Sequence, residues 1–270
     1  MIEKIKIAVI GNGALSSIFI DQYYNYLTDN YELLGIMGRN EEKVKKFAHE
    51  KNTKYYLTLD NLLKDKPDII IEIASRDVII EYAEEIIKNK IDLVVVSVGA
   101  LDDVNFYNKL YNLAKRNRTK IYIAPGAIGG FDLLKTMNLM DKSEVKISTY
   151  KPYTGLEGAK YLQGKTLDKN NKELVFLGNA KEAIDGFPKN VNVSVAASIA
   201  GIGVDDTEVS IYSMPKGNKN MHKIEVENSY GNVEIKIEMT PDKNNPKSSV
   251  ITAWSVVSLL LNLASPIELF

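Results

Sequence analysis

The chain contains two histidines, His49 and His222, and these are its side chains that ordinarily titrate near neutral pH. His49 lies in the charged segment FAHEKN, a pattern that indicates the solvent-facing end of a helix. His222 follows a turn-rich loop and begins an alternating segment typical of a strand. The residues alone leave two interpretations of His222: a strand-edge histidine hydrogen-bonded to water, or the general acid and base of an enzyme's substrate domain.

A glycine turn near the amino terminus has the spacing of a dinucleotide-binding motif. The apolar, β-branched segment 5–10 predicts a strand buried on both faces, and residues 14–27 have helical spacing. Between them, Gly11 and Gly13 match the first two positions of G-x-G-x-x-G/A, with Ser16 at the third. Such a turn brings backbone N–H groups and the positive end of a helix to a pyrophosphate, although an ordinary glycine turn has the same spacing. The predicted cofactor-binding residues here are Gly11, Asn12, Gly13, Ala14 and Leu15.

The end of the second predicted strand, 31–37, bears on the choice between NAD and NADP. Dinucleotide-binding sheets often have Asp or Glu there, about 20 residues beyond the glycines, to bind the ribose hydroxyls. This chain has Gly38 followed by Arg39, and an arginine can pair with a 2′-phosphate that a carboxylate would repel. We therefore expect NADP to be accepted alongside NAD, with Arg39 in the cofactor site. The alternative is that Arg39 stacks on the adenine or lies in solvent.

Strands and helices alternate through the first half of the chain. Apolar strand segments at 68–72, 92–97 and 120–123 are separated by helical segments at 77–90 and 102–117. This alternation predicts an α/β fold with a doubly wound parallel sheet of the Rossmann type. Ligands bind such sheets at the carboxyl ends of the strands, where this chain has several small residues, although each of these is also compatible with an ordinary tight turn. The residues expected at that edge are Ala74, Ser75, Ser97, Gly126 and Ala127.

The second half of the chain has a different pattern. A glycine-rich loop at 124–132 is expected near the nicotinamide, because backbone without side chains can approach a ligand closely. Beyond residue 145, strand segments occur without alternating helices, which predicts a smaller α+β domain with an antiparallel sheet and a polar loop over 154–171. The predicted domains are a dinucleotide-binding domain at 1–125, a substrate and dimerisation domain at 126–249, and an apolar helix at 250–270 that packs back on the first.

Charge and composition exclude several classes of partner. Lys+Arg 34 against Asp+Glu 35 gives a formal net charge of −1, which offers no attraction for nucleic acid or an anionic membrane. With Cys 0 the chain has no disulfide, no thiolate nucleophile and no cysteine metal site, so we expect no bound metal and a reducing, cytoplasmic location. No signal peptide is visible, and the apolar run 256–261 is far too short to span a bilayer.

Several motifs, in order along nearly the whole chain, are similar to those of a known enzyme family. They are VIGNGAL near the amino terminus, IEIAS at 71–75, VVVSVGA at 94–100, PGAIGGFD at 125–132, FPKNVNV at 187–193, NMH at 220–222 and NNPKSS at 244–249. On these motifs the chain resembles the L-aspartate dehydrogenase family of NAD biosynthesis. PGAIGG–D, FP-x-N-x-N-V and N-x-H are far more specific than the glycine turn.

The resemblance implies residue roles and a reaction. In that family the alanine of GAIGG and the second asparagine of FP-x-N-x-N contact the dinucleotide, which implies Ala127 and Asn192 here. The histidine of N-x-H is the active-site residue, which implies His222. The implied reaction is oxidative deamination of L-aspartate to iminoaspartate, or to oxaloacetate and ammonia, with NAD or NADP. The implied assembly is a homodimer.

Two aspects of the implied site stay open. A dicarboxylate needs cationic or amide donors, and the candidates in suitable segments are Lys151, Lys189, Asn245, Lys247 and Ser248. The family usually has Asp-Pro in the loop before N-x-H, where this chain has Met214 and Pro215, so activity or substrate choice can differ.

Two other functions are compatible with this sequence. A related dehydrogenase or reductase with another amino-acid-like substrate, such as homoserine dehydrogenase or dihydrodipicolinate reductase, has the same architecture. The histidine pair and lysine signature associated with that reductase is absent. The second alternative is a non-catalytic dinucleotide sensor, and the intact N-x-H motif argues against it because a sensor needs no acid or base.

Overall fold

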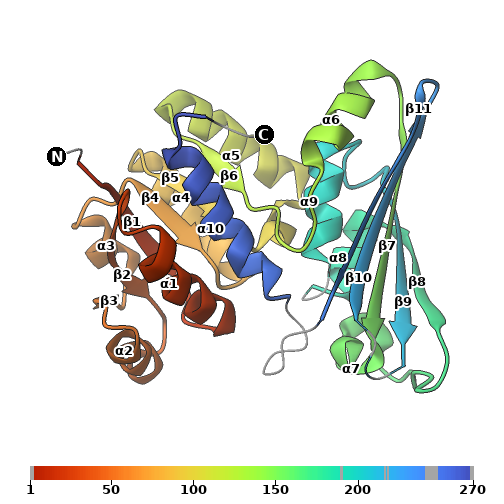
Figure 1. Ribbon diagram of the computed structural model, residues 1–270, viewed down its shortest axis with the longest axis horizontal. Coiled ribbons are helices and arrows are strands. Elements are labelled where there is room, and N and C mark those ends of the chain that lie inside the picture. The colour runs from red at the N-terminus through yellow and green to blue at the C-terminus, as the bar shows by residue number, and fades with distance from the viewer. Residues whose placement is uncertain (1–2, 189–190, 216, 218, 241–248, 268–270) are drawn as a thin grey trace. The chain divides into compact units, whose positions relative to one another are not determined.

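A computed structural model describes residues 3–188, 191–215, 217, 219–240 and 249–267. The chain divides into two compact units, one of residues 1–124 with 252–270 and the other of residues 125–251. Each unit has its own sheet (Figure 1).

The sheet of the first unit has six parallel strands in the order β3-β2-β1-β4-β5-β6. The strands are β1 (Ile5–Ile10), β2 (Tyr31–Met37), β3 (Tyr55–Tyr56), β4 (Ile69–Glu72), β5 (Asp92–Val95) and β6 (Ile121–Ile123). The strand order reverses at the pair β1 and β4, which is the position where doubly wound sheets bind ligands. The predicted Rossmann-type sheet is confirmed.

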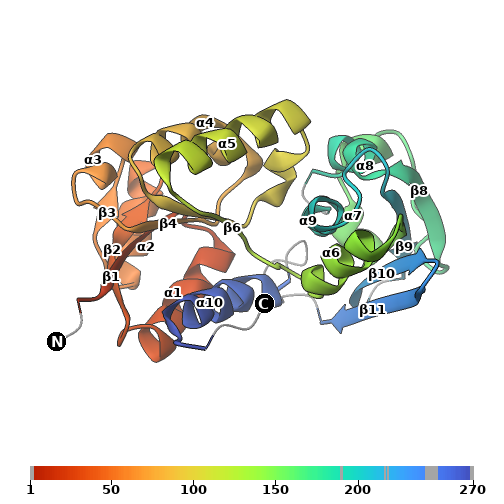
Figure 2. The same cartoon turned by 90° about the horizontal axis from the view of Figure 1, so that it is seen from above.

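Helices cover both faces of this sheet, with α1 and α10 on one face and α4 and α5 on the other (Figure 2). The helical elements of the unit are α1 (Ala14–Tyr26), α2 (Glu41–Glu50), α3 (Leu59–Leu63), α4 (Arg76–Lys88), η1 (Val98–Leu101), α5 (Val104–Asn117) and α10 (Ile251–Ala264). Side-chain caps start some of them: Asn40 accepts from Lys43 N at 2.9 Å, and Asp103 accepts from Asn105 N at 2.8 Å. The sequence pattern missed β3 and α3, which are too short to show a period.

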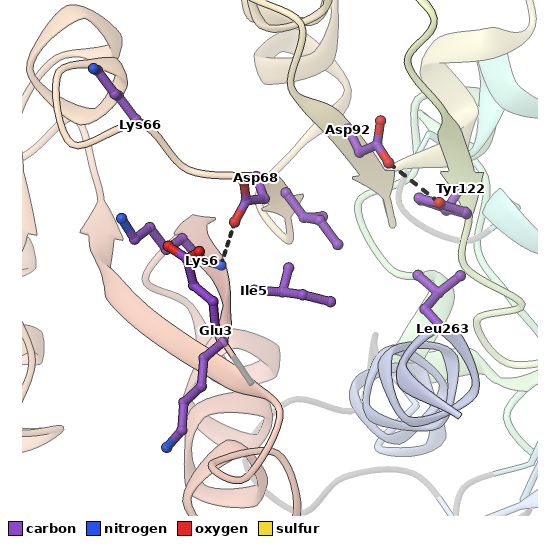
Figure 3. Close-up of a pocket in the computed structure, with 10 residues that line it drawn as sticks. Glu3, Ile5, Lys6, Lys66, Asp68, Asp92, Tyr122 and Leu263 are labelled. Carbon is purple, nitrogen blue, oxygen red and sulfur yellow. Dashed lines mark hydrogen bonds between the residues drawn. The ribbon is translucent and has the colours of Figure 1, made fainter. Parts of the chain in front are cut away.

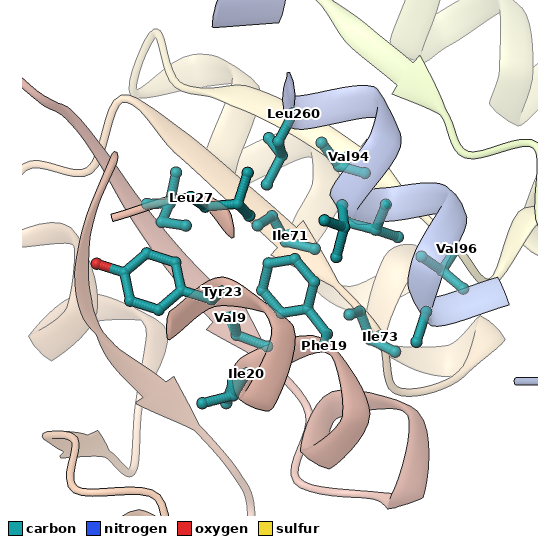
Figure 4. Packing of buried hydrophobic residues seen from close by; sticks show 14 of the residues in the cluster. Val9, Phe19, Ile20, Tyr23, Leu27, Ile71, Ile73, Val94, Val96 and Leu260 are labelled. Atoms are coloured by element: carbon teal, nitrogen blue, oxygen red, sulfur yellow. The ribbon is translucent and has the colours of Figure 1, made fainter. Parts of the chain in front are cut away.

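The core of the first unit includes side chains from the sheet, α1 and α10 (Figure 4). Phe19 of α1, Ile71 of β4 and Leu260 of α10 are fully buried in one cluster. The buried Tyr31 hydroxyl of β2 donates to the Leu260 carbonyl at 2.6 Å. Burying one such apolar side chain contributes roughly 1.5–3 kcal/mol, so the apolar face of α10 holds this helix on the unit. The predicted return of the last helix is confirmed.

The sheet of the second unit has five strands in the order β11-β10-β7-β9-β8. The strands are β7 (Glu144–Pro152), β8 (Glu173–Asn179), β9 (Glu208–Met214), β10 (Asn220–Asn228) and β11 (Gly231–Met239). The expectation of an antiparallel sheet is wrong in one pair, because β7 and β9 run parallel. A parallel neighbour needs a long crossover, and the segment between β7 and β9, which contains β8 and several helices, supplies it.

Helices cover one face of this second sheet (Figure 2). They are α6 (Phe131–Met140), α8 (Ala180–Gly186) and α9 (Asn192–Ala200), while α7 (Tyr153–Leu156) and η2 (Lys160–Leu162) lie in the stretch predicted to be an irregular loop. Burial alternates along β7, so Val145, Ile147, Thr149 and Lys151 share the buried face. That face is apolar at one end and polar at the other.

Candidate active site

The glycine turn after β1 requires glycine at Gly11. Its φ is +129°, and a Cβ there would lie 2.3 Å from the carbonyl oxygen of Ile73, just beyond β4. The same residue donates its N–H to Met37 O of β2 at 2.9 Å. Gly11 therefore lies at the carboxyl ends of β1, β2 and β4. The strand order of the sheet reverses at β1 and β4.

The amino end of α1 is open to a ligand. Gly13 is the N-cap residue and supplies no side-chain cap, and a Cβ built on it would meet nothing within 4 Å. The first N–H groups of a helix lack partners inside the helix, so an exposed, uncapped end attracts an anion. Ser16, at the third motif position, is fully buried and donates to Ile73 O at 3.2 Å. These residues fit a dinucleotide pyrophosphate, with Ser16 in the close helix–strand contact usually made by glycine or alanine.

A buried carboxylate, Glu72, organises the loops beside this turn. It ends β4, is fully buried, and accepts hydrogen bonds from Ala74 N at 2.7 Å, Ser97 N at 2.9 Å and Ser97 Oγ at 2.7 Å. Burial raises the pKa of the Glu72 carboxyl, and the bonds from Ser97 and Ala74 act in the opposite direction. Glu72 thereby ties the loop after β4 to the loop after β5. Sequence reasoning missed this residue, although an acid that ends an all-apolar strand was the available signal.

The structure brings several predicted cofactor residues to one edge of the first unit. A Cβ on Gly11 would be 3.2 Å from Ala74 Cβ, and Ser75 is the N-cap of α4 without a side-chain cap of its own. Ala74 and Ser75 are exposed, whereas the Ser97 hydroxyl is used by Glu72. Asn12 Oδ1 would be 3.2 Å from a Cβ on Gly38, so the turn also meets the end of β2.

Arg39, just past β2, has an acidic partner that the sequence did not reveal. Its Nη2 lies 2.5 Å from Glu81 Oε2 of α4, and the two side chains are 56% and 49% exposed. Such an exposed pair contributes little to stability. The pair matters for cofactor choice, because the Glu81 carboxylate lies beside the arginine predicted to bind a 2′-phosphate.

In the second unit, His222 lies on the buried face of the sheet, opposite Thr149 of β7. The exposed fractions of the two residues are 4% and 0%, and Thr149 Oγ1 lies 3.0 Å from His222 Nδ1. This contact engages Nδ1 and leaves Nε2 as the ring atom able to exchange a proton with a ligand. Burial lowers the pKa of His222 to about 3, with a further contribution from the nearby Lys151 ammonium. The ring is therefore neutral at pH 7.

Three more polar side chains share this end of the buried face: Lys151, Ser213 and Asn220. Lys151 of β7 is paired in register with Ser213 of β9. Burial lowers the pKa of Lys151 to about 8. Of the predicted carboxylate-binding candidates, Lys151 is thus close to the histidine. The other candidates, Lys189, Asn245, Lys247 and Ser248, lie outside the described residues.

The remaining predicted cofactor residues also belong to the second unit. Ala127 is 8% exposed and lies in the loop before α6, where Gly130 has φ +78° and a Cβ would be 2.2 Å from Ile235 Cδ1 of β11. The Ile235 side chain can move aside, but the positive φ favours glycine at Gly130. Asn192 is the partly exposed first residue of α9, which packs against α6. The roles of Ala127 and Asn192 in binding the dinucleotide stay predictions.

A depression of about 690 Å³ lies at the other end of the first sheet, where β1, β4 and β5 begin (Figure 3). There Lys6 N donates to Asp68 Oδ2 at 2.7 Å, and Tyr122 OH donates to Asp92 Oδ2 at 3.3 Å. Ligands of doubly wound sheets bind at the carboxyl ends of strands, so this depression is not the cofactor site.

Two further properties concern only the part of the chain that the structure describes. Within it, His, Cys, Asp and Glu side chains form no group of three or more that could hold a metal ion. Among the helices of those same residues, none has the length and apolar character needed to cross a bilayer.

A doubly wound sheet with an open glycine turn, followed by a mixed-sheet unit with a buried histidine, is the architecture of two-domain, nicotinamide-dependent dehydrogenases. Residues 9–124 match the family model of the homoserine dehydrogenase NAD binding domain, and residues 132–263 match that of the aspartate dehydrogenase C-terminal domain. The chain belongs to the L-aspartate dehydrogenase family.

Individual relatives agree with these matches. The chain is 36% identical over 265 residues to an L-aspartate dehydrogenase of Methanocaldococcus jannaschii, covering 98% of each chain. It is 33% identical over 270 residues to an L-aspartate dehydrogenase of Methanosarcina barkeri, covering 98% of this chain and 99% of that one. The crystal structure of an aspartate dehydrogenase from Thermotoga maritima aligns with a TM-score of 0.78 and 24% identity over 99% of this chain and 100% of that one, which shows the shared fold.

Proposed function

We propose that the protein is an L-aspartate dehydrogenase that oxidises L-aspartate to iminoaspartate with NAD or NADP. The imine enters NAD biosynthesis or hydrolyses to oxaloacetate and ammonia. One observation carries the proposal: a buried, neutral His222 with its Nδ1 held by Thr149, in a chain of this family. The alignments with these relatives cover nearly the whole of both chains. The similarity of the cofactor unit and that of the substrate unit therefore support the same reaction.

The cofactor is expected at the carboxyl edge of the first sheet, and the nicotinamide, when bound, accepts the α-hydrogen with its electron pair. The open amino end of α1 suits the pyrophosphate. Arg39, beside Glu81, suits the adenosine ribose or its 2′-phosphate. The residues proposed to hold the dinucleotide are Gly11, Asn12, Gly13, Ala14, Leu15, Arg39, Ala74, Ser75, Ser97, Ala127 and Asn192.

His222 is proposed to move the protons of the reaction. The α-amino group of L-aspartate is an ammonium at neutral pH and must lose a proton before its lone pair can form the C=N bond. In the tautomer whose Nδ1–H donates to Thr149 Oγ1, the neutral imidazole accepts that proton at Nε2. When the α-hydrogen leaves with its two electrons, the nitrogen lone pair forms the C=N bond of an iminium ion, which releases a further proton to water to give the imine.

The proposed partner is the small-molecule substrate, with neither nucleic acid nor membrane, in the cytoplasm. The net charge of −1 and Cys 0 support this assignment. A homodimer is also proposed, as the resemblance implies. The face of the second sheet opposite His222 carries Lys223, paired with Glu225 at 2.8 Å and Glu234 at 3.0 Å, so an interface there would be partly polar. Light scattering on the purified protein measures the assembly.

Absorbance at 340 nm tests the activity directly. The purified protein is mixed with L-aspartate and either NAD or NADP, and the expected result is a steady rise that depends on aspartate. L-Homoserine and L-glutamate are run in parallel as alternative substrates. If another amino acid is turned over faster, the related-dehydrogenase alternative holds. If dinucleotide binds and no amino acid is oxidised, the sensor alternative holds.

A further inference from the structure

The polar end of the second unit's buried sheet face is a row of side chains from three adjacent strands. In β7 and β10, Thr149 faces His222, and the next residues, Tyr150 and Met221, are also paired. Two residues further along the same face, Lys151 and Asn220 therefore lie on neighbouring strands beside the histidine. Lys151 is paired with Ser213 on its other side. Asn220, Lys151 and Ser213 thus form a line across β10, β7 and β9.

Two members of this line have a buried side-chain oxygen that the described part of the structure leaves unpaired. Ser213 and Asn220 are 0% and 3% exposed, and Ser213 Oγ and Asn220 Oδ1 have no hydrogen-bond partner among the described residues. Buried polar atoms are ordinarily hydrogen-bonded, because removing them from water unpaired is unfavourable. The Thr149 hydroxyl, by contrast, is engaged by His222. A hydroxyl and an amide oxygen left unpaired beside a proposed acid and base indicate a ligand subsite.

The hydrogen-bonding groups of Lys151, Ser213 and Asn220 indicate which ligand groups can bind beside them. The Lys151 ammonium and the Ser213 hydroxyl donate, which suits a carboxylate. Asn220 Oδ1 can only accept, so it suits the N–H of an amine. The amine would lie beside His222, the residue proposed to take its proton. The depressed pKa of Lys151, about 8, fits a buried ammonium that gains an anion when a ligand binds.

We propose that Lys151, Ser213 and Asn220 form the amino-acid subsite, with Lys151 and Ser213 binding one carboxylate and Asn220 Oδ1 accepting from the α-amino group. The proposal rests on the dehydrogenase function in naming the amino acid as substrate. The carboxylate is either the α- or the β-carboxylate of aspartate, and the experiment below distinguishes them.

Steady-state kinetics and dinucleotide binding are compared in Lys151→Met, Ser213→Ala and Asn220→Leu. The expected result is a rise of roughly tenfold or more in KM for L-aspartate in each variant, with the Kd for dinucleotide unchanged. Asn220→Asp, which keeps an acceptor oxygen, is expected to retain more affinity than Asn220→Leu. The matched controls are on the opposite face of the same sheet: Lys172→Met, whose ammonium lies over the Tyr150 and Tyr212 rings, and Ser210→Ala on β9.

Inhibitors identify which carboxylate is bound. If Lys151→Met weakens inhibition by succinate and leaves inhibition by L-asparagine unchanged, Lys151 binds the β-carboxylate. If it weakens both, Lys151 binds the α-carboxylate. An unchanged KM and unchanged inhibition in Lys151→Met and Ser213→Ala would overturn the subsite and leave the dehydrogenase function standing.

Ligand binding separates the subsite from the activity. If the wild-type protein oxidises no aspartate, the proposed function fails, and the subsite is judged by thermal stabilisation with succinate. A rise in Tm in the wild type that Lys151→Met abolishes and Lys172→Met keeps supports a carboxylate subsite. No rise in the wild type overturns it. Circular dichroism on each variant establishes that it is folded.

Discussion

Thr149 Oγ1 and His222 Nδ1 lie 3.0 Å apart on the buried face of the second unit's sheet. The two residues are paired in register across β7 and β10, so the backbone ladder sets the distance rather than a flexible loop. A ring held through Nδ1 keeps a defined orientation and presents Nε2. Thr149 is in this sense a positioning residue for His222.

Replacing Thr149 by valine tests this relationship. Valine has nearly the same shape and lacks the hydroxyl, so Thr149→Val is expected to lower kcat by about tenfold, the effect of one lost buried hydrogen bond. KM for dinucleotide is expected to stay unchanged, and the pH profile of kcat is expected to shift because the ring loses its partner. Thr149→Ser restores the hydroxyl and is expected to recover most of the rate. A valine variant with wild-type kcat and pH profile would remove the positioning role.

His222→Gln is expected to lose most turnover, about a hundredfold or more, because glutamine cannot accept the substrate's proton. Dinucleotide binding, followed by the fluorescence of the reduced cofactor, is expected to stay near that of the wild type. His49→Gln is the matched control, since His49 is exposed near the end of α2. Near-normal turnover in His222→Gln would exclude the assigned role.

The depressed pKa of His222 predicts a loss of stability in acid. Burial sets the pKa of His222 at about 3 in the folded protein, against 6.5 for an exposed histidine, so the unfolded chain takes up its proton first as the pH falls. The free energy of unfolding is therefore expected to decrease from pH 6.5 downward, until about 3. Urea unfolding at several pH values measures it, and the decrease is expected to be shallower in His222→Gln. Equal slopes in the two proteins would contradict the buried, neutral ring.

The depressed pKa of Lys151 predicts a gain of stability at alkaline pH. The pKa of Lys151 is about 8 in the folded protein, against 10.5 for an exposed lysine, so the folded protein releases this proton first and its stability rises with pH across that window. Below pH 8 the buried ammonium is destabilising. Lys151→Met is expected to raise the free energy of unfolding at pH 7 by about 1–3 kcal/mol, with a smaller gain near pH 10. A destabilised variant at pH 7 would show that the ammonium is structurally required.

The fold was largely predictable because its signals are local. A few residues are enough to recognise a buried strand such as Ile5–Ile10 or the glycine turn at Gly11. The alternation of such strands with helices predicts the first sheet. The parallel pairing of β7 and β9 was not predictable from strand patterns, since the crossover that permits it is spread over the intervening segment. Periodicity shows that strands exist but does not show which strands are neighbours.

The site was predictable only in part, for a similar reason. His222 and the glycines are marked by residue type and motif, whereas Glu72 acts through contacts with Ser97, 25 residues away. Ser213 and Asn220 are ordinary polar residues in alternating strands, and only the register shows that they flank Lys151. Residues whose role depends on contacts with distant parts of the chain cannot be recognised from a single sequence by type or spacing.

The ion pair between Arg39 and Glu81 predicts how cofactor choice can be changed. The Glu81 carboxylate pairs with the Arg39 guanidinium at 2.5 Å, and its negative charge would repel a 2′-phosphate bound there. Glu81→Gln is therefore expected to raise the ratio of kcat/KM for NADP over NAD by roughly threefold to tenfold, and Arg39→Ala is expected to lower it. Glu84→Gln, on the same helix and paired with Lys109, controls for a general change of charge. A ratio that Glu81→Gln leaves unchanged, or shifts toward NAD, would show that this pair stands outside the cofactor site.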